Sequence, residues 1–194
     1  MKHIFGALVG CLLLVCAWMA RAEDFARPLL LVAAPTLQGP YSRTAVIVVP
    51  LGDKHIGFIL NRATDQTLGA LFPDHAPSAK VIEPVFFGGP EADSAIFALL
   101  RRDPGQPSMR LFGDVYMTGS GNSIDRIIEQ TPNDARYFAG FVGWMPGELD
   151  MEIEKRIWYV GDADPELVFQ KDTGAMWEQL LERLGKGILR SASR

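Results

Sequence analysis

Both cysteines of the chain, Cys11 and Cys16, lie in the apolar segment that opens it, and the residues after Ala22 contain none. The part of the chain after Ala22 can therefore form neither disulfides nor thiolate–metal bonds, and it has no thiol nucleophile. It must therefore be held together by a hydrophobic core. With 194 residues, 48% apolar and 22% charged, the chain has the length and composition of one globular domain with such a core.

The opening segment has the order of residues found in a secretory signal. Lys2 gives a basic start, residues 4–20 form an apolar run, and Ala20-Arg21-Ala22 places small residues where the peptidase requires them. We therefore predict a signal peptide over residues 1–22, cleaved after Ala22, and a periplasmic or secreted domain over residues 23–194. The alternative is an uncleaved anchor, because the run is only slightly shorter than the roughly 20 residues that span a bilayer. Membrane contact would then be confined to this segment, whereas a misassigned start codon would leave the protein in the cytoplasm.

The charge balance argues against generic nucleic-acid binding. The chain carries 19 Lys and Arg against 23 Asp and Glu, and loss of Lys2 and Arg21 with the signal peptide would leave 17 against 23. An acidic surface repels phosphate backbones. No dense basic run is present, and no helix-turn-helix with a basic recognition helix can be drawn. We expect no cofactor, and as partner an unknown small ligand or another protein.

Short apolar runs rich in β-branched residues predict strands, and they are densest in the first half of the chain. They cover residues 29–34, 45–49, 56–60, 85–87, 95–100, 115–118 and 137–142. Strand-rich sequence therefore comes first, with most of the helical sequence later.

Helical spacing is clearest near the C-terminus, where an apolar stripe from Met176 to Leu184 predicts a helix that begins after Asp172 or Thr173 and ends at Gly185. A short helix is predicted over residues 67–72. Another is predicted over residues 123–130, with three isoleucines facing inward and Asp125 in its first turn. A last one is predicted over residues 148–156, where Glu152 can pair with Arg156.

Few residues after the opening segment suit catalysis. His55 and His75 have no metal-ligand spacing, and nothing in the sequence ties either to a serine. The segment Gly119-Ser120-Gly121-Asn122-Ser123 could present backbone N–H groups to an anion, but it lacks a P-loop lysine and the third glycine of a dinucleotide fingerprint. We interpret it as a tight strand-to-helix connection. The carboxylates between Glu148 and Glu154 could hold a cation or act in acid–base chemistry, but we interpret them as a solvated helix face.

Polar and glycine residues gather where predicted strands end, a place where α/β proteins often contact ligands. A salt bridge, a turn or a strand terminator would explain the same residues. Under the first interpretation the candidate ligand-binding residues are Arg43, Asn61, Arg62, Gly88, Gly89, Gly119, Ser120 and Asn122.

Several of these landmarks together resemble the YqgE/AlgH family. The resemblance is carried by residues 29–35, 42–46, Gly57-Phe58-Ile59-Leu60-Asn61-Arg62, Phe87-Gly88-Gly89-Pro90, 140–144, 147–150, Trp158, Trp177 and Gly185. Their order and spacing agree over about residues 29–185. Departures are Gly39-Pro40-Tyr41, Ala63 and Glu91, and a signal segment is unlike most members. The resemblance implies a single α+β domain with a curved, partly barrel-like mixed β-sheet flanked by helices.

Three functions remain open at this point. The first is a non-catalytic exported protein that binds a small ligand or a protein partner through the strand-end residues. The second is transcriptional regulation, which only the family label implies. The third is a hydrolase or transferase that uses the Gly119–Ser123 loop to hold an anion, with Ser120 as nucleophile.

Overall fold

A computed structural model describes the backbone of residues 25–192 and the side chains of residues 25–185. The predicted signal peptide, residues 1–22, lies outside the described residues. Within them no helix is both long and apolar enough to cross a membrane.

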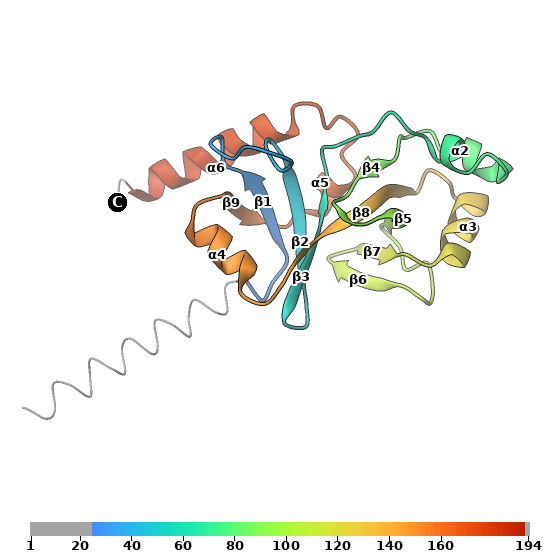
Figure 1. Cartoon of the computed structure of the whole chain (residues 1–194), viewed down its shortest axis with the longest axis horizontal. Helices are drawn as coiled ribbons and strands as arrows, with labels where there is room; N and C mark the ends of the chain where they lie inside the picture. The colour runs from blue at the N-terminus through green and yellow to red at the C-terminus, as the bar shows by residue number, and fades with distance from the viewer. Residues whose placement is uncertain (1–24, 193–194) are drawn as a thin grey trace, which may run out of the picture.

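One curled sheet runs through the whole domain (Figure 1). The strand order is β6-β7-β5-β8-β3-β2-β1-β9, every neighbouring pair is antiparallel, and β4 lies parallel to β8 off this path. The strands are β1 Leu29–Ala33, β2 Ala45–Leu51, β3 Lys54–Ile59, β4 Phe86–Phe87, β5 Glu91–Leu100, β6 Met109–Phe112, β7 Val115–Thr118, β8 Ala135–Trp144 and β9 Trp158–Asp162. The sheet closes only part of a barrel, which confirms the predicted curved α+β single domain.

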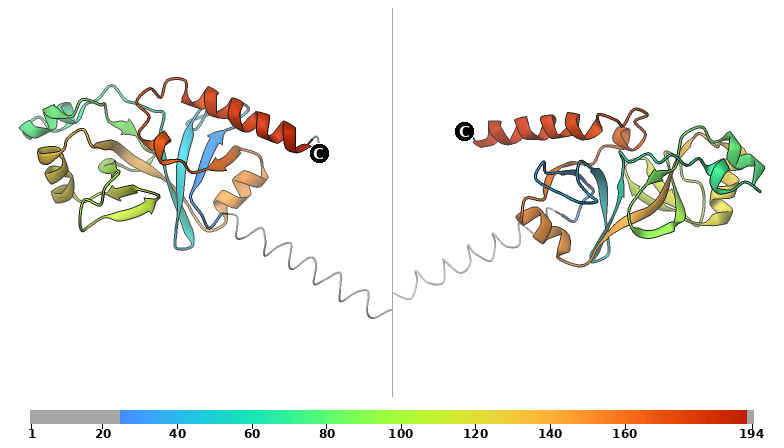
Figure 2. Two further views of the ribbon diagram at one scale, coloured as in Figure 1. Left: turned by 180° about the vertical axis from the view of Figure 1, so that it is seen from behind. Right: turned by 45° about the horizontal axis from the view of Figure 1, so that its top comes forward.

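The helices cover this sheet from two ends. They are α2 Leu68–Leu71, the 3₁₀ helix η1 Ala76–Lys80, α3 Gly121–Gln130, α4 Glu148–Glu154, α5 Pro165–Val168 and α6 Met176–Ala192. Figures 1 and 2 show α6 running past β1 and β9, while α2 and α3 lie together at the opposite end. Each end has its own core. The larger core lies around β1, β2 and the start of α6, and the smaller one lies beneath α2, η1 and α3.

Strand β8 joins the two ends of the sheet. Its first part, residues 135–141, pairs with β5, and its last part, residues 142–144, pairs with β3. Just before this change of partner β8 bends at Gly140, whose φ of +68° is a left-handed conformation that residues with a Cβ rarely adopt. The bend at Gly140 lies next to this change of partner, so the single ten-residue strand β8 pairs with strands of both halves of the sheet.

Residues Gly88 and Gly89 pack directly against this bend. The Gly88 N–H donates to the Ala139 carbonyl at 2.8 Å, and its own carbonyl accepts from the Ile59 N–H at 2.9 Å. A Cβ on Gly88 would lie 2.2 Å from the Gly140 oxygen. The absence of side chains at these buried positions therefore lets β3 and β8 be bridged by backbone alone.

Two strands were missed by the sequence-based prediction. Strand β6 carries Arg110 among its apolar residues, and β9 ends in Gly161-Asp162. Both are edge strands of the described sheet, each with one neighbour. An edge strand with one partner needs no long apolar run, and neither β6 nor β9 has the five consecutive apolar residues that identified β1 and β2.

The predicted end of the last helix at Gly185 is wrong, because α6 continues to Ala192. Gly185 does not have the left-handed conformation that ends a helix. The helix predicted from Ser123 begins at Gly121, so Asp125 falls beyond its first turn. Its three isoleucines, Ile124, Ile127 and Ile128, are buried as expected.

The predicted pairing of Glu152 with Arg156 is also wrong. Helix α4 ends at Glu154 and Arg156 has φ +57°, so the two residues are not on one helical face. Instead a single Glu152 oxygen accepts from the indole N–H groups of Trp144 at 2.9 Å and Trp158 at 2.8 Å. Glu148 accepts from the Met145 N–H at 3.0 Å. At these two positions the acidic face of α4 is structural rather than freely solvated.

We predict opposite effects for two glycine-to-alanine substitutions. Gly88→Ala should lower the free energy of unfolding by about 3 kcal/mol, because its Cβ would clash with the Gly140 backbone, which is fixed within the sheet. Gly185→Ala should raise it by about 0.5–1 kcal/mol, since its Cβ position is open and alanine favours the helix. Urea unfolding followed by circular dichroism measures both. A destabilising Gly185→Ala would contradict a helix that continues through this residue.

Candidate functional site

The first group of predicted site residues, Arg43, Asn61 and Arg62, does come together in the structure. The Asn61 side chain accepts from the Ala45 N–H and donates to the Arg43 carbonyl, both at 2.9 Å. Arg62 donates to the Ser42 carbonyl at 3.2 Å. These bonds tie the end of β3 to the loop before β2. Both the oxygen and the nitrogen of the Asn61 amide thus make hydrogen bonds within the fold.

The Arg43 side chain turns toward the last helix. Its guanidinium lies 4.6 Å from the centre of the Trp177 ring and pairs with the Glu178 carboxylate. Trp177 in turn donates its indole N–H to the Ala33 carbonyl at 2.8 Å. Arg43 therefore helps to hold α6 against β1. Two further predicted residues, Gly88 and Gly89, are buried at the bend of β8.

The remaining predicted residues, Gly119, Ser120 and Asn122, lie elsewhere. They follow β7, which is separated from β3 by β5 and β8, a distance of about 14 Å along the sheet at the usual strand spacing. The Ser120 carbonyl accepts from the N–H groups of Ser123 and Ile124 at the start of α3, which confirms a tight strand-to-helix connection. The predicted residues therefore form two separate groups.

Both histidines in the described part of the chain are within hydrogen-bonding distance of another residue. His75 Nδ1 lies 2.8 Å from the Ser78 hydroxyl, and His55 Nε2 lies 2.9 Å from the Phe25 carbonyl. His75, Gly119 and Gly121 line a common cavity of about 270 Å³ with mainly apolar walls, but Ser120 is not part of its lining. Among residues 25–185 no cluster of three or more His, Cys, Asp or Glu could hold a metal ion.

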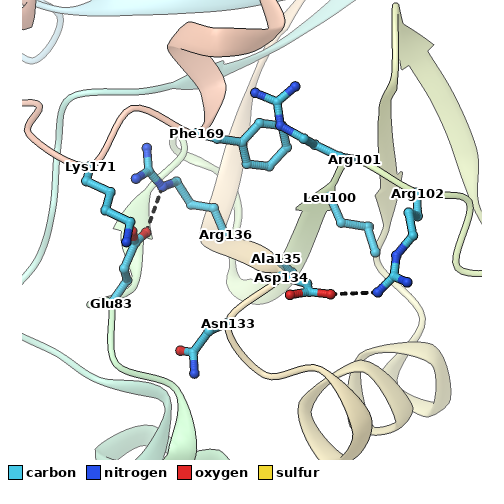
Figure 3. Close-up of a pocket in the computed structure, with 10 residues that line it drawn as sticks. All are labelled: Glu83, Leu100, Arg101, Arg102, Asn133, Asp134, Ala135, Arg136, Phe169 and Lys171. Atoms are coloured by element: carbon cyan, nitrogen blue, oxygen red, sulfur yellow. Dashed lines mark hydrogen bonds and ion pairs between the residues drawn. The ribbon is translucent and has the colours of Figure 1, made fainter.

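A different and larger cavity, of about 370 Å³, lies between the end of β5, the start of β8 and the loop after α5 (Figure 3). We call it the arginine pocket. Its lining residues are Glu83, Leu100, Arg101, Arg102, Asn133, Asp134, Ala135, Arg136, Phe169 and Lys171. Register explains the clustering, because Leu100 on β5 faces Ala135 on β8 and the charged residues flank this pair. The pocket thus collects four cationic side chains from three segments.

Arg136 is the fixed base of this pocket. Its side chain is only 2% exposed, and its Nε donates to Glu83 at 2.9 Å while its Nη1 donates to the Val168 carbonyl at 2.9 Å. The guanidinium also lies 4.5 Å from the centre of the Phe86 ring. A buried arginine without these partners would be strongly destabilising. The contacts hold the cation in one orientation.

The other arginines are held at the rim. Arg101 lies 4.7 Å from the centre of the Phe169 ring and pairs with Asp114 at 3.0 Å and Glu166 at 2.8 Å. The hydrogen bond to Asp114, supported by Glu166, raises the pKa of Arg101 and keeps it charged. Arg102 is more exposed and pairs with Asp134 at 2.6 Å. Each of the three arginines is therefore paired with at least one carboxylate, and the pocket is largely preorganised.

None of these pocket residues was singled out from the sequence. A signal was present, since Arg101-Arg102 directly follow a predicted strand, Arg136 directly precedes another and Asp134 lies two residues before Arg136. The same strand-end argument used for Asn61 applies to them. The sequence does not reveal that β5 and β8 are neighbours in the sheet. Only this pairing brings the end of β5 close to the start of β8.

We predict that Asn61 acts in stability. Asn61→Ala should lower the free energy of unfolding by about 1–3 kcal/mol, because the Ala45 N–H and the Arg43 carbonyl lose their partner. The matched control is Asn122→Ala, at an exposed position on α3, which should change it by less than about 0.5 kcal/mol. Urea unfolding compares the two; equal effects would argue against this assignment.

The chain is similar to known proteins over nearly all of the described residues. A sequence model of the family described as AlgH-like matches residues 30–188. A relative from Vibrio cholerae is 30% identical over 169 residues, which cover 80% of this chain and 89% of the relative. One from Chlorobium limicola is 29% identical over 174 residues, with 86% and 91% covered. Both are named only as UPF0301 proteins, a label that states no activity.

Solved structures agree on the fold. The solution structure of the AlgH protein from Pseudomonas aeruginosa superposes with a TM-score of 0.69 at 22% identity and covers 84% of this chain and 90% of that one. The crystal structure of a protein from Corynebacterium diphtheriae gives 0.66 at 23% identity, with 81% and 86% covered. With sequence and fold in agreement over the same region, the chain belongs to the AlgH-like family of uncharacterised proteins.

Proposed function

We propose that this AlgH-like protein is an exported, non-catalytic binding protein whose ligand enters the arginine pocket. The observation that carries the proposal is the buried, fully oriented Arg136 at the base of a cavity of about 370 Å³. Cavities of this size are typical of small-molecule sites. A buried cation has a desolvation cost, and a ligand that contacts Arg136 would explain why the fold keeps it there.

The chemistry of the lining favours binding over catalysis. Its ten residues include no Ser, Thr, Cys, His or Tyr. Both carboxylates are used in ion pairs, Glu83 with Arg136 and Asp134 with Arg102. Charges tied in this way orient a ligand well but exchange protons poorly. Ser120, the nucleophile of the hydrolase alternative, lies outside both this pocket and the cavity of His75.

The ligand prediction is tested with a screen that does not depend on ligand charge. Metabolites are screened by thermal shift, and hits are mapped by amide chemical shifts. At 100 times its Kd, a pocket ligand should stabilise the protein by about 2.7 kcal/mol. The amide signals of Leu100, Ala135 and Phe169 should move, while those of Lys54 and Arg156 stay unchanged. Hits that map to the Gly119 cavity instead would contradict the proposal.

Export is tested separately, by fractionation and intact-mass measurement. We expect a periplasmic or secreted product that lacks residues 1–22, because small residues precede the predicted cleavage point. Ala22→Glu should block cleavage and leave the precursor at the membrane. Ala26→Glu makes the same chemical change beyond the cleavage site and should not block it. Full-length wild-type protein in the soluble cytosol would refute export and favour the gene-regulatory alternative.

A further inference from the structure

We infer that a second surface, which we call the β5 groove, binds an extended peptide segment of a partner protein that carries apolar and basic side chains. Two cavities form this groove: the one of about 270 Å³ beside Gly119, and one of about 320 Å³ that includes Leu71. They adjoin at Phe72, Ser94 and Ile96, which line both. The β5 groove shares no lining residue with the arginine pocket, so the inference goes beyond the proposed function.

Strand β5 has an open edge in this groove. It pairs with β7 only at residues 98–100, because β7 ends at Thr118. Residues 92–95 have no register partner on β8 either, since the register shifts between Glu91 and Ile96. The cavity beside Gly119 lies along residues 94–96 of this stretch. An unpaired strand edge presents backbone N–H and C=O groups to which an extended peptide can add as a further strand.

The walls of the β5 groove are apolar and partly exposed. Leu71 and Phe72, at the end of α2, are 41% and 45% exposed. Ile124 and Ile128 of α3 line the cavity beside Gly119, and α2 and α3 lie together at this end of the sheet (Figure 1). Neighbouring apolar residues that stay exposed beside a cavity mark an interaction site. An apolar side chain of the added peptide would fill this space, as in other strand-addition sites.

The charges of the β5 groove favour a basic peptide. Its lining residues include no Lys or Arg, and their only carboxylates are Asp93 and Asp125. Both are exposed, and among the described residues neither carboxylate takes part in a hydrogen bond or an ion pair. In the arginine pocket, by contrast, Glu83 and Asp134 are each paired with an arginine. A Lys or Arg of the peptide would meet an unpaired carboxylate here, which favours basic partners over acidic ones.

The probe is the capped peptide acetyl-Lys-Val-Phe-Val-Lys-amide, titrated into the full chain and followed by amide chemical shifts. The amides of Ser94, Ala95 and Ile96 should shift. At least one of them should exchange its hydrogen about tenfold more slowly or less, because pairing with the peptide protects it. Binding that leaves exchange at these three amides unchanged, or that moves the signals of the arginine pocket instead, would overturn the inference.

Three control ligands separate the contributions to binding. Replacing both Lys of the peptide by Glu should weaken binding about tenfold, because like charges then meet at the groove. Replacing Val-Phe-Val by Ser-Ser-Ser keeps the charges and the backbone but should abolish measurable binding, since no apolar side chain enters the cavities. Equal binding of either control would contradict the inference. Phenylalanine amide has the ring and an amine but cannot form a strand; if it binds as tightly as the peptide, the groove takes a small molecule instead.

Charge-matched variants locate the site. Asp93→Asn and Asp125→Asn should each weaken binding of the Lys peptide about two- to fivefold, the range of an exposed ion pair. Their controls, Asp53→Asn and Asp150→Asn, remove the same charge from exposed positions in the β2–β3 turn and on α4. The controls should bind as the wild type does. If all four variants lose affinity equally, the peptide is attracted only by the net charge of the protein, and the inference is wrong.

A second copy of this chain is the alternative occupant of the β5 groove. Light scattering after gel filtration, with and without the Lys peptide, distinguishes the two. We expect a monomer, or a dimer that the peptide leaves intact. A dimer that the peptide dissociates would show that the groove serves self-association, and would overturn the inference. None of these outcomes depends on the arginine pocket, so their failure leaves the proposed function unaffected.

Discussion

The backbone contact between Gly88-Gly89 and the bend of β8 is the constraint on which the architecture depends. A Cβ on Gly88 or Gly89 would come within about 2.2 Å of β8 backbone atoms, so only glycine allows β3 and β8 to be bridged here. The left-handed Gly140 then lets β8 change partners from β5 to β3. Both cores are attached to this strand. Close backbone packing by itself accounts for the two glycines in the family landmark Phe87-Gly88-Gly89-Pro90.

The arginine pocket follows from the same arrangement. Because β8 runs beside β5 before it bends, its first residues lie next to the last residues of β5, and the charged side chains at both ends meet. Phe86 on β4, which pairs with β8, supplies the ring beneath Arg136. Glu83, just before β4, supplies the counter-charge. The arginine pocket thus arises where three chain segments must already converge for the sheet to form.

The success of the sequence-based prediction differs between the fold and the site. Strands such as β1 and β2 are buried on both faces, so they appear as continuous apolar runs. In the edge strands the run is broken or short, by Arg110 in β6 and by Gly161-Asp162 after three apolar residues in β9. The sequence singles out Asn61 as a candidate ligand-binding residue. Its hydrogen-bond partners, Arg43 and Ala45, are 18 and 16 residues away and so could not be identified from the local sequence. Polar residues at strand ends look alike in sequence whether they bind a ligand or close a loop.

The amino-acid sequence by itself determined the cysteine-free single domain, most of its strands, the apolar face of α3 and the family resemblance, because these depend on local periodicity and composition. Only the tertiary structure decided that Glu152 holds two tryptophans, that Asn61 and Gly88 serve the fold, and that four cations share one cavity. The physical reason is that hydrogen bonds and ion pairs act over a few ångströms in space. Which residues come that close is set by strand order, which no local pattern encodes.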